Sequence, residues 1–106
     1  MRNWLNVVAK KIYIKKFEQV IFHLHQATAT WVETVPVHET FKGQTVWQGD
    51  VEVFDLTGQP KAKRASAWSY NDEKEEKYTA VLEIPPVESA LTAVRVSIVA
   101  ESKGKK

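Results

Sequence analysis

The chain has 106 residues, of which 43% are hydrophobic and 26% charged, with four glycines and four prolines. These values are typical of one globular domain and exclude collagen-like, low-complexity and wholly disordered chains. Because the sequence contains no cysteine, it also excludes a disulfide framework, a thiol nucleophile and a cysteine-ligated zinc site.

The N-terminal apolar stretch stops at Lys10 and Lys11, which is too short for a secretory signal. No apolar run approaches the ~20 residues that span a bilayer. We therefore expect a cytoplasmic protein that does not enter a membrane.

The formal net charge is +2. The basic residues gather in three clusters, whereas the loop at 71–76 is acidic. No acidic residue precedes Glu18, so residues 1–17 are locally basic. Basic clusters favour contact with nucleic acid, although an ordinary solvated surface is the preferred interpretation. The candidate nucleic-acid contacts are Lys10, Lys11, Lys15, Lys16, Lys61, Lys63 and Arg64.

The first predicted element is a helix from about Tyr13 to Trp31, because apolar residues fall on one stripe at helical spacing. A second apolar stripe is rotated from the first, so residues 3–12 form either a separate short helix or a bend in the same one. A strand over residues 18–30 is the less favoured alternative. The second stripe consists of Trp4, Leu5, Val8 and Ile12.

Pro36 predicts that the short alternating segment around it is an edge strand, since proline cannot donate to a sheet. Residues 42–44 form a tight connection, and residues 45–55 are the clearest strand. Gly49 within this strand predicts a bulge or the close approach of another backbone. One face of the strand carries Trp47, Gly49, Val51 and Val53, and the other, expected to be solvated, carries Gln48, Asp50 and Glu52.

A turn at 55–60, a strand at 62–70, the acidic loop and a strand at 77–84 complete an antiparallel meander. From Val87 onward a helix with Ser89 as its N-cap is expected, with a strand over 91–100 as the alternative. The sequence thus predicts one α+β domain over residues 1–102. It has an N-terminal helix, three or four antiparallel strands and a C-terminal helix packed on the sheet, followed by a disordered basic tail at 103–106.

No group of residues predicts catalysis or a cofactor. On a helix, His23 and His25 point in different directions and cannot hold one metal ion, and His38 lacks the HExxH spacing. No serine lies in a GxSxG motif, and the glycines are isolated. We therefore do not expect an enzyme.

The four tryptophans are the most informative feature of the composition. We expect Trp47 and Trp68 on neighbouring strands, with at least one ring against a terminal helix and a cost of about 3–5 kcal/mol for Trp47→Ala. Side chains off the apolar stripes suggest an interface, so Phe22→Ala should leave the protein folded but more monomeric. The candidate interface residues are Phe22, Trp31 and Val96.

Residues 45–58, 61–64 and 67–69 resemble small bacterial proteins of unassigned activity, of the type carried on integron gene cassettes and other mobile elements. The resemblance implies a cytoplasmic bacterial accessory protein and no mechanism. Such proteins often have Gly-His-Pro where this chain has Gly58-Gln59-Pro60, which removes a candidate imidazole.

Two functions are compatible with these patterns. The preferred one is a non-enzymatic protein-interaction module that associates with itself, as a dimer, or with another protein. The alternative is a nucleic-acid-binding domain, because the order helix, three strands, helix is superficially that of double-stranded RNA-binding domains. Against it, the C-terminal helix supplies only Arg95 before its tail.

Overall fold

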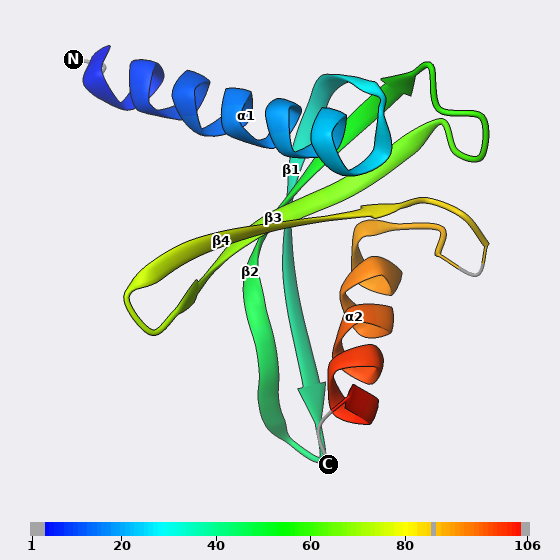
Figure 1. Ribbon diagram of the computed structural model, residues 1–106. Helices are drawn as coiled ribbons and strands as arrows, with labels where there is room; N and C mark the ends of the chain where they lie inside the picture. Colours follow the sequence, from blue (N-terminus) through cyan, green and yellow to red (C-terminus); the bar gives the residue numbers. More distant parts are fainter. Residues whose placement is uncertain (1–3, 86, 105–106) are drawn as a thin grey trace.

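The computed structural model describes residues 4–85 and 87–104, in which a four-stranded antiparallel meander lies between two helices (Figure 1). The strand order is that of the chain, so the α+β fold expected from the sequence is confirmed. The elements are α1 (Trp4–His25), β1 (Thr28–Phe41), β2 (Gln44–Thr57), β3 (Arg64–Asp72), β4 (Glu75–Leu82) and α2 (Ala90–Gly104).

Helix α1 is continuous, so both apolar stripes belong to one helix. It ends at His25 and not at Trp31, because Gln26 adopts a left-handed φ of 54° and the carbonyl of His25 accepts a hydrogen bond from the side chain of Gln59 at 2.8 Å. The β-branched residues that follow favour a strand. The strand alternative was therefore correct for residues 28–30 and wrong for residues 18–25.

Strand β1 is the edge strand predicted around Pro36, but it is longer than expected and begins at Thr28. Pro36 pairs with Asp50 of β2 at the margin of the sheet, where a missing N–H group is tolerated. Trp31 lies on this strand and not at a helix end. Its register with β2 shifts between Trp31 and Glu33 and again between Glu39 and Thr40.

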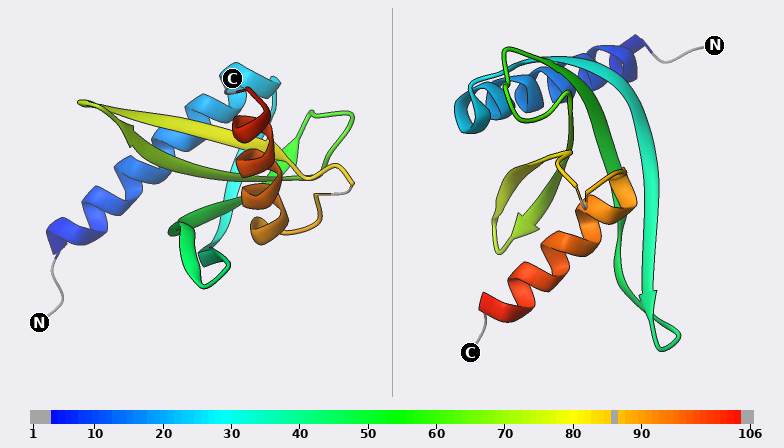
Figure 2. Two further views of the ribbon diagram at one scale, coloured as in Figure 1. Left: turned by 90° about the horizontal axis from the view of Figure 1, so that it is seen from below. Right: turned by 90° about the vertical axis from the view of Figure 1, so that its right-hand side faces the viewer.

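The two hairpins of the sheet are joined over a short length. Strand β2 pairs with β3 only between residues 52–55 and 64–67, beyond which the β1–β2 and β3–β4 hairpins diverge (Figure 1). Residues 51–54 of β2 are all buried, because alternate side chains point to opposite faces and each face is covered by a helix (Figure 2).

Each helix therefore has its own core. Helix α1 packs through Ile14, Phe17 and Ile21 on one face, together with Ala27, Ala29, Phe54, Ala65, Ala67 and Ala80. Helix α2 packs on the opposite face in a cluster of Val37, Val51, Val53, Trp68, Val87, Ala90, Ala93 and Val94. The expectation that the C-terminal helix contacts the sheet is confirmed.

Trp47 and Trp68 meet where β2 and β3 separate. Their ring centroids are 5.7 Å apart at an interplanar angle of 73°, and Trp68 belongs to the cluster under α2, as expected. A Cβ atom on Gly49 would lie 3.1 Å from the Trp47 ring. The close approach at Gly49 is therefore that of a side chain from its own strand, and the prediction of a bulge or a backbone contact there is wrong.

The remaining connections are tighter than the sequence suggests. Strands β3 and β4 extend into the acidic segment, so the turn is confined to Glu73, which has a φ of 59°, and Lys74.

Helix α2 begins after Ser89, the predicted N-cap. The side chain of Ser89 accepts a hydrogen bond from the N–H of Thr92 at 3.2 Å, and the N–H of Ser89 donates to Thr92 Oγ1 at 2.9 Å.

Residues 91–100 are helical and not a strand, and α2 continues through Gly104. The tail expected from residue 103 is thus helical as far as Gly104, and residues 105–106 lie outside the described part of the chain. Neither helix, within the described residues, combines the length and apolar character needed to cross a membrane.

The two paired tryptophans differ in burial, and this difference predicts different costs. Trp68 is 4% exposed, so Trp68→Ala should lower the free energy of unfolding by about 3–5 kcal/mol. Trp47 is only partly buried and should cost less when changed to alanine. Urea denaturation of both variants measures this; a larger loss for Trp47→Ala would contradict it.

Candidate functional site

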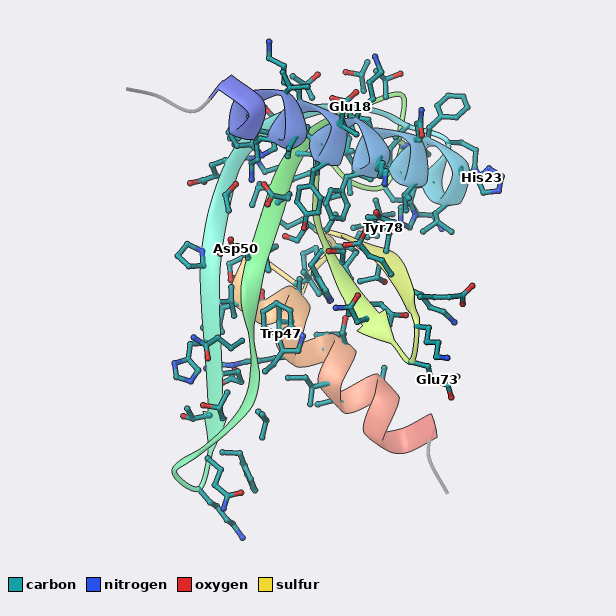
Figure 3. The ribbon with its side chains drawn as sticks, turned by 90° about the vertical axis from the view of Figure 1, so that its left-hand side faces the viewer. Glu18, His23, Trp47, Asp50, Glu73 and Tyr78 are labelled. Carbon is teal, nitrogen blue, oxygen red and sulfur yellow. The ribbon has the colours of Figure 1, made fainter. Side chains whose placement is uncertain are left out.

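The most buried ionisable side chain is Glu52 of β2, whose side chain is 0% exposed. The alternation of the strand predicts that Gln48, Asp50 and Glu52 are all solvated. Gln48 and Asp50 are exposed, as predicted, but the prediction is wrong for Glu52. The reason is that Lys10 of α1 reaches Glu52, whereas Asp50 lies on the part of the hairpin that α1 leaves open (Figure 3).

Three donors from two other elements surround this carboxylate. Oε1 of Glu52 accepts hydrogen bonds from Trp31 Nε1 at 2.9 Å and from Thr34 Oγ1 at 2.5 Å, both on β1. Oε2 lies 3.3 Å from Nζ of Lys10 on α1, which also donates to Thr34 Oγ1 at 3.1 Å. We call Glu52, Lys10, Trp31 and Thr34 the Glu52 centre.

Aromatic and hydroxyl groups extend the centre under α1. Nζ of Lys10 lies 5.5 Å from the ring centroid of Tyr13 and 6.0 Å from that of Trp31. The hydroxyls of Tyr13 and Ser69 share a hydrogen bond at 3.1 Å. Burial raises the pKa of Tyr13, and the hydrogen bond with Ser69 opposes this shift only in part.

This arrangement fastens α1 to the sheet. Both oxygens of the carboxylate are occupied by the chain's own donors, and the Lys10 side chain, 45% exposed, is the part of the ion pair that reaches solvent. On the other face, a more exposed ion pair joins α2 to β1, where Arg95 donates to Glu39 and holds the pKa of that carboxyl below its usual range. The Glu52 centre anchors the N-terminal half of α1, while the packing of Ile14, Phe17 and Ile21 sets which side of the helix faces outward.

A signal for Glu52 exists in the sequence. The residues before and after it are valines, and the next residues on its own face are Phe54 and Leu56, so apart from Asp50 its near neighbours along the strand are apolar. Such a setting indicates a buried acid that needs partners. The partner Lys10 lies 42 positions away along the chain and carries no local signal.

The three candidate interface residues do not form one surface. Phe22 is 62% exposed on the side of α1 away from the sheet, as expected for a residue off the apolar stripe. Val96 is exposed on α2, which covers the opposite face of the sheet. Trp31 is partly exposed but belongs to the Glu52 centre through its indole N–H.

The outward side of α1 contains further apolar residues that the sequence did not single out as interface candidates. Ile12 is 56% exposed, and Val8 is exposed beside it. Both belong to the second apolar stripe of the sequence, and both are exposed on the continuous helix, so that stripe was the available signal. We define the α1 outer face as Val8, Lys11, Ile12, Lys15, Gln19 and Phe22.

The candidate nucleic-acid contacts divide into two groups. The first group lies on α1. Lys10 is paired with Glu52, whereas Lys11, Lys15 and Lys16 are exposed and make no ion pair with any described residue. Lys61, Lys63 and Arg64 lie near the C-terminal end of α1, where Gln59 binds His25, and Arg64 Nε is paired with Asp55 at 2.8 Å. At a rise of 1.5 Å per residue, Lys16 lies about 14 Å along the helix axis from the C-terminal end of α1, so the two groups are separated.

The histidines are dispersed. His25 donates from Nε2 to the carbonyl of Ala80 at 2.9 Å, His38 bonds with Thr45 at 2.6 Å, and His23 points away from the sheet (Figure 3). Within residues 4–85 and 87–104, no three histidine or carboxylate side chains gather in a way that could hold a metal ion.

The β3–β4 turn presents the opposite charge from α1. Glu73 and Glu75 are exposed and make no ion pair with any residue in the described ranges, while Glu76 accepts a hydrogen bond from Tyr78 at 2.6 Å. Tyr70, on the strand leading to this turn, is 45% exposed.

Comparison of the chain with protein-family models, with curated protein sequences and with solved structures gives no match.

Removal of the Glu52 carboxylate should destabilise the fold. Glu52→Ala leaves the Trp31 and Thr34 donors without their acceptor and should lower the free energy of unfolding by about 2–4 kcal/mol. Lys10→Met should cost less, because Lys10 is half exposed, and Lys11→Met is the matched control with little effect. Urea denaturation gives the three values; equal losses for Glu52→Ala and Lys11→Met would refute the assignment.

Alkaline titration should identify Tyr78. Its hydroxyl donates to the Glu76 carboxylate, which together with burial raises the pKa of Tyr78 from 10.0 to about 12. Since the folded state favours the neutral phenol, its contribution to stability is present below pH 10 and is lost as the pH rises toward 12. Because the pKa of Tyr13 is also raised, ultraviolet absorbance should show two late ionisations, of which Tyr78→Phe removes one and Glu76→Gln shifts that one to lower pH. An unchanged titration curve in both variants would contradict this.

Proposed function

We propose that this domain is a non-enzymatic protein-interaction module that associates with itself through the α1 outer face. The observation that carries the proposal is the exposure of Ile12 and Phe22, each more than half exposed on a helix whose opposite side is buried. Large apolar side chains that share one exposed face mark interaction surfaces in small domains.

The rigidity of α1 supports this proposal. Three residues of its inner side are in the core, and Lys10 ties its N-terminal half to Glu52. A helix held in this way presents its outer side in a fixed position, so little conformational entropy is lost when a partner binds. Full burial of one large apolar side chain contributes about 1.5–3 kcal/mol, so a few of them matter for affinity.

The hydrogen bonds of Glu52 do not favour a catalytic role for this buried carboxylate. The carboxylate of Glu52 is occupied by three donors of the chain itself. A general base must reach a substrate proton, and a carboxylate held in this way does not.

Nucleic-acid binding is the second candidate, and one observation favours it. Lys11, Lys15 and Lys16 are exposed and form no ion pair with a described residue, as phosphate contacts would require. However, Ile12 and Val8 lie among these lysines, and apolar side chains gain nothing from a phosphate backbone. Protein association accounts for both kinds of residue.

Light scattering coupled to size-exclusion chromatography tests the proposal. The parent should be a dimer whose proportion falls on dilution, and Ile12→Ala and Phe22→Ala should remain folded but shift toward the monomer. Val96→Ala is the matched control, because this side chain is similarly exposed but lies on α2. A parent that is monomeric at every concentration would rule out self-association, and dissociation by Val96→Ala alone would place the interface on α2.

A further inference from the structure

The α1 outer face is basic as well as apolar, and this limits what can cover it. Lys11 and Lys15 lie on it and Lys16 lies beside it, all exposed and without an ion pair to a described residue. No acidic residue precedes Glu18 in the chain. Two such faces brought together would place like charges in contact, so symmetric packing of α1 on α1 is disfavoured.

The same molecule carries a complementary surface at the β3–β4 turn. Residues 72–76 read Asp-Glu-Lys-Glu-Glu, and Glu73 and Glu75 have no ion pair within the described residues. Tyr70 adds a half-exposed aromatic ring on the strand that leads to the turn. Glu73 lies at the far end of the hairpin from α1 (Figure 3), so within one molecule it does not pair with the lysines of α1.

We propose that the α1 outer face of one copy receives the acidic β3–β4 turn of a second copy. This inference rests on the self-association proposed above and adds its partner surface. A two-fold symmetric dimer would contain the contact twice, because each copy supplies both surfaces. Helix α1, with 22 residues, is about 33 Å long and offers room for a hairpin turn.

The two kinds of side chain have different roles in this contact. Exposed charge pairs contribute little affinity singly, so burial of Ile12, Phe22 and Tyr70 supplies most of it. The charges select the turn over a second α1 face and accelerate association at low salt. Dimerisation should therefore weaken as salt is added, which purely apolar association does not do.

Charge reversal on the two surfaces provides the test. The pairs Lys11→Glu with Lys15→Glu, and Glu73→Lys with Glu75→Lys, should each raise the dimer dissociation constant about tenfold or more. An equimolar mixture of the two variants should recover a dimer, because each contact again joins opposite charges. Lys61→Glu and Glu88→Lys are the matched controls, since they reverse exposed charges elsewhere. Circular dichroism verifies that all variants are folded.

Each result separates the inference from the proposed function. A parent protein that is monomeric at every concentration would rule out both the proposed self-association and this inference. A dimer that tolerates both charge reversals keeps self-association but overturns the assigned surfaces. Two monomeric variants that do not combine on mixing show that the surfaces do not meet each other. Loss of binding to a short RNA or DNA duplex in the lysine variant, with dimerisation unchanged, would identify nucleic acid as the partner of α1 and overturn the inference.

Discussion

A carboxylate without solvent exposure holds the N-terminal half of α1 on the sheet. Burial of a charge is costly unless donors replace the lost water, and Glu52 obtains them from Trp31, Thr34 and Lys10. Because these donors belong to β1 and α1, the requirement brings together three elements at one point. This polar contact adds to the packing of α1, whose buried inner side leaves Ile12 and Phe22 exposed.

The second constraint is the short junction between the two hairpins. Strands β2 and β3 pair only between residues 52–55 and 64–67, and because α1 and α2 cover opposite faces here, the core divides into two clusters. Each face near the junction receives one helix, and the Trp47–Trp68 pair fills the place where the strands separate. Gly49 suits this place because a Cβ atom there would make a tight contact, 3.1 Å, with the Trp47 ring.

The meander, the edge position of β1 and the Ser89 cap could be predicted, because each depends on local spacing or on one residue's backbone chemistry. The errors occur where distant parts of the chain decide. Four consecutive buried residues, 51–54, have no alternation in burial, so period-two reasoning assigned Glu52 to the wrong environment. The end of α1 at His25 depends in part on Gln59, which lies 34 positions further along the chain.

The bond from His25 to the carbonyl of Ala80 has a consequence for the margins of the sheet. Strand β4 ends the sheet, and an uncovered edge can template the addition of strands from other molecules, which leads to aggregates. His25 occupies one of the acceptors that an added strand would need, and Pro36 interrupts the opposite margin in β1. Strand addition is therefore hindered locally at both margins of the sheet, by His25 on β4 and by Pro36 on β1.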